Sequence, residues 1–272
     1  MQSIRIPRTG FSWLFLLLAP AALAAQMPPD EVLKDFKING DFVLEVDGEV
    51  LRGSEIFFSE RAVAYLVMAP DLSSPIMISP RTRTVESVHL MKVMKKNGGA
   101  SVDILADAEL TPISSFKLQD SNVVFTLNDK TAKLKPKPWL LGLHKGDRLK
   151  EHNPEYAFGA AEYTPAASYI EALRGIQKDV RVRVYFGSWC PHCKRIVPRI
   201  LRVADELEES RLRFEYYGLP SPFGDEPEAV RAGIHSVPTV VVFIGGEEAA
   251  QLSGDDLNAP EAALRRTVGE SS

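Results

Sequence analysis

Cysteine is scarce in this chain of 272 residues, which has only Cys190 and Cys193. Proteins that depend on disulfides for stability carry several bridges that close long loops, whereas a bridge across two intervening residues constrains little chain. A structural zinc site needs four ligands, and the sequence has no second Cys-x-x-Cys and no histidine pair at finger spacing. The cysteine pair is therefore better explained by chemistry than by a structural role.

The sequence also lacks an excess of positive charge. It contains 32 lysines and arginines against 36 acidic residues, a formal net charge of −4. A mildly acidic chain has no electrostatic basis for binding the phosphate backbone of a nucleic acid. We therefore expect no nucleic-acid partner.

Long apolar runs are absent except near the N-terminus. There Arg5 and Arg8, with no acidic residue, precede the apolar run 11–25, which is interrupted by Pro20 and ends in small residues. The run falls short of the roughly 20 residues that span a bilayer. This order predicts a secretory signal peptide at residues 1–24, cleaved near Ala24, and export to the bacterial periplasm or an equivalent compartment. A retained N-terminal anchor is the alternative, and no cysteine follows the run to carry a lipid.

Residues 25–137 are predicted to form a mainly-β domain of unknown role. Short runs of alternating side chains are separated by turn residues, whereas the run 85–96 is ambiguous between a long strand and a helix. The histidine His89 stands apart from any ligand-spaced cluster. Such a domain could dimerise the protein, hold a substrate or dock a membrane redox partner. The predicted strands include residues 42–46, 62–68, 75–79, 115–118 and 123–127.

The composition changes at residues 135–138, where two prolines two positions apart can continue neither a helix nor a strand ladder. We assign residues 138–163 to a linker, although the apolar run 139–141 indicates that it packs against something. Helices and strands then alternate through residues 164–272, which predicts an α/β domain with a mixed sheet. Thr164 is the expected cap of its first helix, and Asn258 with Glu261 forms the expected capping box of its last. The other predicted helices are 194–208 and 226–232, and the strands are 180–186, 212–217 and 239–244.

The cysteines lie between the end of the strand 180–186 and the start of a helix. Unpaired backbone N–H groups and the positive end of the helix dipole there stabilise a thiolate, which is the attacking form of cysteine. Cys190 is therefore the expected nucleophile, and Cys193, one turn later, the expected resolving cysteine. Pro191 and His192 separate them, and His192 can favour the Cys190 thiolate and so make the disulfide more oxidising. Lys194 adds positive charge or simply points into solvent.

Two segments resemble the thioredoxin family. Residues 189–194, Trp-Cys-Pro-His-Cys-Lys, with Pro198 in the following helix, are similar to its active-site helix, and residues 233–243 are similar to the segment that carries its cis-proline. The resemblance covers residues 164–268. It implies that the Val237–Pro238 bond is cis, that the Val237 backbone pairs with a substrate strand, and that Trp189 offers apolar surface to substrates, although packing against the domain body explains Trp189 equally well.

The chain also departs from the family pattern. The Pro-His dipeptide is similar to that of DsbA-type oxidases, yet residues 193–238 leave no room for the helical insertion of DsbA-type and DsbC-type domains. Many family members place a buried carboxylate six residues before the first cysteine, where this chain has Val184. Glu215 could take the place of this buried carboxylate only if its side chain points inward. Arg181 and Arg183, on a strand expected to be buried, receive no function, and His235 either tunes the cysteines or is an exposed loop residue.

These patterns together predict a thiol-disulfide oxidoreductase that acts on exported proteins through Cys190 and Cys193, in a direction that the sequence leaves open. The expected partners are protein thiols and disulfides and a membrane redox protein, with a homodimer possible through the N-terminal domain. No metal or organic cofactor is implied beyond the redox-active disulfide. The alternative is a partner-binding or chaperone protein on a thioredoxin scaffold, whose cysteines are incidental.

Overall fold

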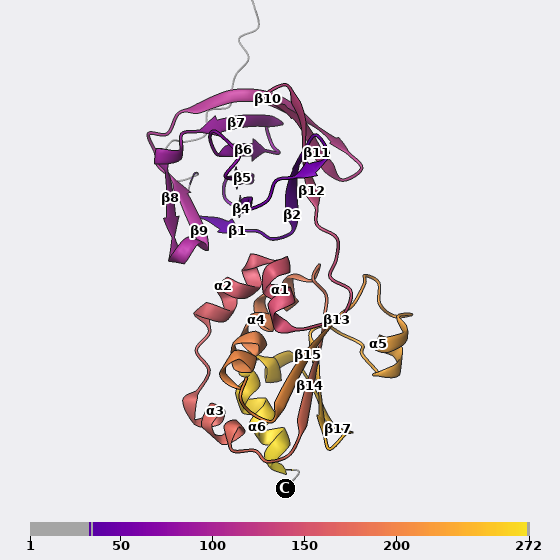
Figure 1. The fold of residues 1–272 in the computed structure, drawn as a ribbon. Coiled ribbons are helices and arrows are strands. Elements are labelled where there is room, and N and C mark those ends of the chain that lie inside the picture. Colours follow the sequence, from indigo (N-terminus) through magenta and orange to yellow (C-terminus); the bar gives the residue numbers. More distant parts are fainter. Residues whose placement is uncertain (1–32, 34, 271–272) are drawn as a thin grey trace, which may run out of the picture.

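The computed structural model describes residue 33 and residues 35–270, which form two lobes (Figure 1). The first lobe consists of strands, and the second combines a smaller sheet with helices. Within this described part, no helix is long and apolar enough to cross a membrane. The predicted signal peptide lies outside the described residues, so its cleavage stays a prediction.

The first lobe is one antiparallel sheet of twelve strands, in the order β3-β2-β12-β11-β10-β7-β6-β5-β4-β1-β9-β8. The mainly-β prediction for this region is confirmed. Its strands are β1 (Phe36–Ile38), β2 (Phe42–Val46), β3 (Glu49–Val50), β4 (Glu55–Ser59), β5 (Ala64–Met68), β6 (Ile76–Ser79), β7 (Thr84–Val88), β8 (Val93–Lys96), β9 (Ser101–Ile104), β10 (Leu110–Gln119), β11 (Asn122–Leu127) and β12 (Lys130–Pro136).

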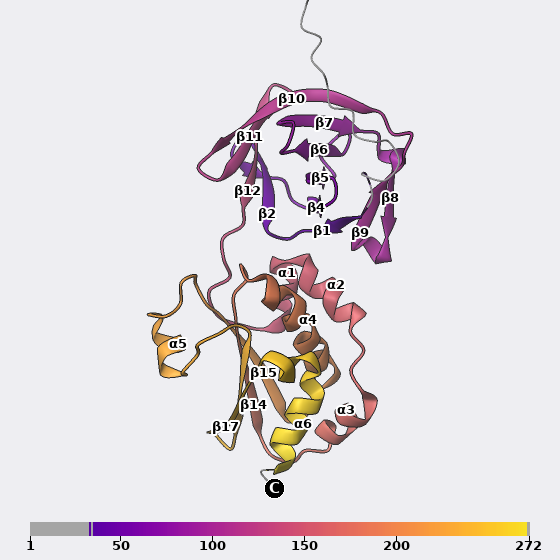
Figure 2. The ribbon, with the colours of Figure 1, turned by 180° about the vertical axis from the view of Figure 1, so that it is seen from behind.

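Two hydrophobic cores lie on opposite faces of the central strands of this sheet. Successive side chains alternate between them: Ile56 belongs to one core and Phe57 to the other, and in β6 Met77 faces away from Ile76 and Ile78. Figures 1 and 2 show the central strands between one arm formed by β2, β11 and β12 and another formed by β8 and β9. Both faces are therefore covered, which explains the uninterrupted apolar run in β6.

The ambiguous segment 85–96 is neither a helix nor one long strand. It contains the end of β7, a 3-10 helix at Leu90–Lys92, and β8. The Nδ1 atom of His89 accepts a hydrogen bond from the backbone N–H of Met91 at 3.3 Å and so caps the 3-10 turn. This contact interrupts the strand pattern and gives His89 a structural task.

The second lobe is an α/β fold with a five-stranded mixed sheet, as predicted. The sheet order is β13-β15-β14-β16-β17, and β14 pairs parallel with β15 and antiparallel with β16. Its strands are β13 (Gly142–His144), β14 (Val180–Phe186), β15 (Leu212–Gly218), β16 (Thr239–Ile244) and β17 (Glu247–Ser253), and its helices are α1 (Gly146–His152), α2 (Pro154–Glu162), α3 (Ala167–Arg174), α4 (Pro191–Glu206), α5 (Pro227–Arg231) and α6 (Pro260–Glu270).

The prediction that residues 138–163 form a linker is wrong. They contain β13, which pairs with the edge strand β15, followed by helices α1 and α2. Leu149 of α1 and Tyr156 of α2 are fully buried in the same core as the cysteines. The short elements and their prolines resemble a connector in sequence, but their apolar side chains pack against α4.

The two faces of β14 carry different side chains. Val180, Val182 and Val184 lie in the large core beneath α4, whereas Tyr185 belongs to a smaller core beneath α5 on the other face. The alternation follows from the two-residue period of a strand. It places the helix that carries the cysteines over the valine face.

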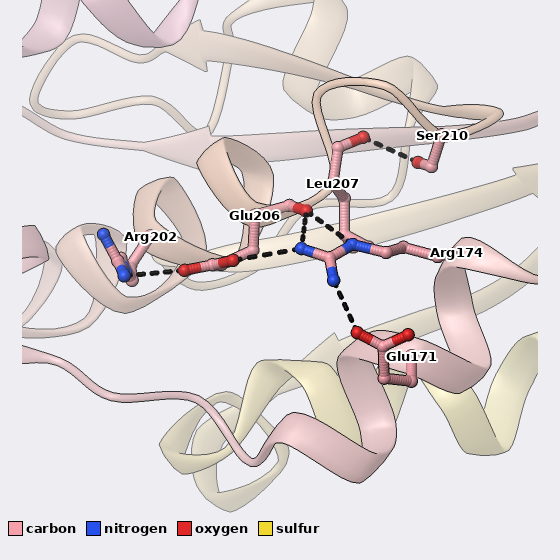
Figure 3. Close-up of polar contacts among 6 residues, drawn as sticks. All are labelled: Glu171, Arg174, Arg202, Glu206, Leu207 and Ser210. Atoms are coloured by element: carbon pink, nitrogen blue, oxygen red, sulfur yellow. Dashed lines mark hydrogen bonds and ion pairs between the residues drawn. The ribbon is translucent and has the colours of Figure 1, made fainter.

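Polar contacts at the C-terminal end of α4 hold that helix to α3 (Figure 3). The Arg174 guanidinium donates to the backbone oxygen of Glu206 at 2.9 and 3.2 Å and to its carboxylate at 3.1 Å. Arg202 donates to the other carboxylate oxygen of Glu206 at 2.6 Å, and Ser210 donates to the Leu207 carbonyl at 2.7 Å. These donors satisfy carbonyl groups that a helix leaves unpaired at its end, and so fix α4 from the end opposite the cysteines.

Both predicted helix caps in this lobe are wrong. Helix α3 begins at Ala167 rather than after Thr164, and α6 begins at Pro260 rather than after Asn258. The Glu261 carboxylate, buried to 3% exposure, instead accepts hydrogen bonds from the Tyr163 hydroxyl at 2.8 Å and the Ala166 N–H at 3.1 Å. A side chain distant in sequence thus supplies the acceptor that local capping was expected to provide.

The lobes meet where the loop between β1 and β2 touches α2 and α4. The Gly40 N–H donates to Glu155 Oε1 at 2.9 Å, and Lys137 Nζ donates to the His152 carbonyl at 2.7 Å. A Cβ atom at Gly40 would lie 1.9 Å from Asn153 Oδ1, so only glycine fits this approach. The first lobe therefore contacts the segment next to the helix that carries the cysteines.

Candidate active site

The local fold places Cys190 at the start of helix α4. Strand β14 ends at Phe186, and Cys190 is the N-cap residue of α4, its sulfur accepting a hydrogen bond from the Cys193 N–H at 3.4 Å. Pro191 occupies the first turn, where its missing N–H costs no hydrogen bond. Both cysteines are free thiols in this structure, and Cys190 is 8% exposed. The predicted pair is thus assembled with its first sulfur at the helix N-terminus, the positive end of the helix dipole.

Cys193 occupies a different environment from Cys190. It is fully buried, and its sulfur accepts a hydrogen bond from the Gly187 N–H at 3.4 Å. Burial raises the pKa of the Cys193 thiol far above its usual range, and the neighbouring Cys190 raises it further. Cys193 is therefore a neutral thiol that enters the chemistry only after Cys190 has reacted.

The loop before β16 faces Cys190. The Val237–Pro238 peptide bond is cis, and Cys190 Sγ lies 3.9 Å from the Val237 carbonyl oxygen. Pro238 is buried and Val237 is partly exposed. The structure thus brings Cys190, Val237 and Pro238 together. A second cis peptide bond, Ser221–Pro222, has no counterpart among the sequence predictions.

His192 is exposed, and its ring contacts a residue that sequence reasoning did not single out. Its Nδ1 atom lies 2.6 Å from a terminal nitrogen of Arg195, one helical turn later. Because a guanidinium can only donate, Nδ1 is the acceptor in this pair. The cationic neighbour of the dipeptide is therefore Arg195.

Trp189 takes part in an aromatic cluster beside the cysteines. Its indole N–H donates to the Leu219 carbonyl at 2.9 Å, and its ring centroid lies 6.3 Å from that of Trp139 and 6.5 Å from that of Phe223. Trp189 is partly buried against the core, whereas Trp139 is 46% exposed. The two expectations for Trp189 are compatible, because its body packs while the cluster leaves apolar surface open.

Lys194 does not point into solvent. Its side chain is 12% exposed and forms ion pairs with Asp41 of the first lobe and, at 3.9 Å, with Glu155 of α2. Sequence reasoning missed both carboxylates because each is far from the cysteine motif along the chain. The active-site helix is therefore tied electrostatically to the first lobe.

The residues on the opposite face of β14 form a separate network. Arg183 donates to Glu215 at 2.8 and 3.0 Å and to the buried carboxylate of Glu228 at 2.8 Å. Arg181 lies over the Phe243 ring, 4.1 Å from its centroid. Glu215 thus pairs with a residue on the face away from Val184 and the cysteines. The two arginines have structural partners, and Glu215 is not a substitute for the missing buried carboxylate.

Two further predictions concern histidine and metal. His235 lies exposed on the loop that precedes the cis-proline. Within the described residues, no group of three or more histidine, cysteine, aspartate or glutamate side chains is arranged to hold a metal ion.

Comparisons with known proteins identify a family for the second lobe. A model of the thioredoxin family matches residues 162–268. The chain is 33% identical over 126 residues to the chloroplastic thioredoxin M4 of Arabidopsis thaliana, a match that covers 46% of this chain and 61% of that protein. It is 30% identical over 105 residues to thioredoxin-2 of Saccharomyces cerevisiae, covering 38% of this chain and 93% of that protein.

Among solved structures, the chain is similar to thioredoxin f2 of Chlamydomonas reinhardtii, with 17% identity and a TM-score of 0.29 over 38% of this chain and 92% of that one. The sequence match to the yeast protein extends over nearly its whole length. The family match lies in the second lobe and includes both cysteines and the cis-proline. The chain belongs to the thioredoxin family.

Proposed function

We propose that this protein is a thiol-disulfide oxidoreductase whose second lobe exchanges electrons with partner proteins. The observation that carries the proposal is the difference between its two sulfurs. Cys190 lies at the N-terminus of α4 beside the Val237 carbonyl, whereas Cys193 is a fully buried, neutral thiol one turn behind it. A nucleophile that keeps some exposure, 8% for Cys190, in front of a fully buried second thiol is the arrangement that dithiol exchange requires.

In the reducing direction, the Cys190 thiolate attacks a disulfide of the partner. A Cys190–partner bond forms while the partner's own S–S bond breaks, and the released sulfur takes up a proton. Cys193 then loses its proton and attacks Cys190, so that the Cys190–Cys193 bond forms and the second partner sulfur leaves as a thiol. Two electrons and two protons pass to the partner, and the oxidising direction is the reverse.

The partner would lie across the loop that carries the cis-proline. The Val237 backbone, in the bend just before β16, can pair with a strand of the partner, and the aromatic cluster around Trp189 offers apolar surface beside the sulfurs. The sulfur pair itself carries the electrons, so the reaction needs no metal or organic cofactor. Export, periplasmic partners, a membrane redox protein and dimerisation through the first lobe belong to the proposal on the strength of the sequence.

The first test is the equilibrium of the Cys190–Cys193 pair with glutathione, measured by thiol labelling. A potential of about −120 to −180 mV would make the protein a disulfide donor or isomerase, and one near −270 mV a reductase. Catalysed reduction of a protein disulfide should be lost in both Cys190→Ser and Cys193→Ser variants. Failure to form the disulfide reversibly, or full function without either cysteine, would favour the alternative of a partner-binding or chaperone protein.

A further inference from the structure

A buried phenol lies in the same core as Cys193, on helix α2, which ends where the matched family region begins. Tyr156 of α2 is fully buried, and among the described residues its hydroxyl has no hydrogen-bond partner. A buried hydroxyl left unpaired destabilises the fold, because it has lost its hydrogen bonds to water. Such a group in a native core calls for an explanation.

The contacts of α2 place Tyr156 alongside the first turns of α4. Glu155 pairs with Lys194, and a Cβ atom at Gly159 would lie 2.9 Å from the Cβ of Pro198. Residues four apart on α2 therefore meet residues four apart on α4, so the two helices run side by side in the same direction. Tyr156, between these contacts, faces the core that contains Cys193.

The ring contacts of Tyr156 agree with this placement. Its ring lies edge-on to Phe186, with the centroids 6.3 Å apart. The residue after Phe186 is Gly187, whose N–H donates to Cys193 Sγ. Tyr156 therefore packs against the residue that precedes the Gly187 donor, and its ring lies in the same core as the Cys193 sulfur.

The electrostatics keep this phenol a donor. Burial raises the pKa of Tyr156 far above its usual range, and negative charge on Cys193 raises it next, ahead of charge on the adjacent Glu155. Negative charge on Asp41 and on Cys190 also raises the pKa of Tyr156. Lys194 forms ion pairs with the carboxylates of Asp41 and Glu155. Tyr156 therefore keeps its proton and cannot act as a base, but it can donate to a sulfur that becomes negative.

We propose that the Tyr156 hydroxyl stabilises the Cys193 thiolate by donating a hydrogen bond to it during disulfide exchange. This inference rests on the proposed function. In resolution, Cys193 releases its proton to water and attacks Cys190, the Cys190–Cys193 bond forms, and the partner sulfur leaves and takes up a proton from water. In the oxidising direction, a partner thiolate attacks Cys190 and Cys193 is the leaving sulfur. The Tyr156 hydroxyl then donates a hydrogen bond to the departing Cys193 thiolate. Tyr156 keeps its own proton throughout.

The variant Tyr156→Phe removes the hydroxyl and keeps the ring. Tyr216→Phe is the matched control, because Tyr216 is also buried with an unpartnered hydroxyl, but the charges that act on it are Asp205 and Asp147 rather than the cysteines. The reduced protein is mixed with an aromatic disulfide, 5,5′-dithiobis(2-nitrobenzoate). A first release of coloured thiolate reports attack by Cys190, and a second reports resolution by Cys193.

We expect Tyr156→Phe to slow the second release about tenfold at pH 7 and to move its pH profile about one unit upward, since a hydrogen bond to a charged group is lost. The first release should be unchanged, and Tyr216→Phe should change neither. A second-phase profile for Tyr156→Phe that matches Tyr216→Phe would overturn the inference, whereas the absence of a second release in the unmodified protein would overturn the proposed function instead.

A site-specific 3-fluorotyrosine at position 156 provides a second readout that keeps the hydroxyl. The fluorine makes the phenol a stronger donor, so the second release should become faster and its pH profile should move downward. A purely structural role for Tyr156 would leave that profile in place. Thermal unfolding of each variant identifies any change that arises from misfolding.

Discussion

The two lobes of this protein bury their apolar residues in different ways. In the first lobe, the central strands alternate their side chains between two cores, and every strand pairing is antiparallel. In the second lobe, one face of β14 lies under helices α1 to α4 and α6, while the other carries the arginine and glutamate network. The second arrangement leaves a strand end and a helix N-terminus free to hold a reactive sulfur.

This difference also separates stability from chemistry. The two reactive sulfurs, the cis-proline and the buried phenol all belong to the second lobe, whereas the first reaches the site through Asp41 and the Gly40 contact. The first lobe thus touches the helix that carries the cysteines without contributing either sulfur. Whether the two lobes differ in stability as they do in chemistry depends on whether they unfold separately or as one unit.

Matched truncations of one core leucine in each lobe should have the largest effect on the stabilities of the two lobes. Leu66 in the first lobe and Leu201 in the second are 0% and 1% exposed, and replacing either by alanine should cost about 2–5 kcal/mol. Outside the predicted signal peptide the tryptophans are Trp139 and Trp189, both near the cysteines. In urea, Leu66→Ala should shift the circular-dichroism transition more than the tryptophan fluorescence transition, and Leu201→Ala should shift both. Coincident transitions for Leu66→Ala would mean that the lobes unfold as one unit.

Gly40→Ala should have a smaller effect, confined to the contact between the lobes. The added methyl group would displace Asn153, whose side chain is buried and accepts the Glu155 N–H at 2.8 Å as the cap of α2. Loss of a cap costs about 1 kcal/mol, and overpacking adds about 1 kcal/mol or more. Urea unfolding should show a loss of about 2 kcal/mol.

Gly224→Ala is the control for that change. Gly224 has open space around it and is exposed on the loop before α5. Its substitution should leave stability within about 0.5 kcal/mol of the unmodified protein. Equal effects of the two alanines would show that the Gly40 contact is not a constraint on the lobes.

The positions of the cysteines and the cis-proline could be predicted from sequence because their signals are local. Cys190, Cys193 and Pro238 lie in short segments whose spacing along a strand, a turn and a helix fixes their geometry. The strand pattern of both lobes follows from the period of their apolar residues. Local reasoning failed where a partner came from far along the chain, as at the start of α3, where Glu261 replaces the expected local acceptor.

Tyr156 and the ion pairs of Lys194 illustrate the same limit. Asp41 lies 153 residues before Lys194, and no periodicity links them. Helix α2 is short and follows a proline-rich segment, so its sequence favours a connector, and only its packing against α4 shows that Tyr156 belongs to the core of the site. Long-range packing, rather than propensity, decides these positions.

The smallest predicted effect is a pH dependence at the contact between the lobes. The pKa of His152 is lowered from 6.5 to about 4, first by burial and then by positive charge on Lys137, Arg148 and His144, against an opposing effect of Asp41. The unfolded chain therefore binds a proton near pH 6.5 that the folded protein binds only near pH 4, so stability is lost as the pH falls through this window and is unaffected above it. Because the ring is only partly removed from solvent, screening limits the loss to on the order of 1 kcal/mol. The free energy of unfolding is measured in urea at pH 7 and at pH 4.5. His152→Gln should lose about 1 kcal/mol less between these pH values than the unmodified protein does. Equal losses would show that the His152 ring is solvated and would argue against burial at the contact between the lobes.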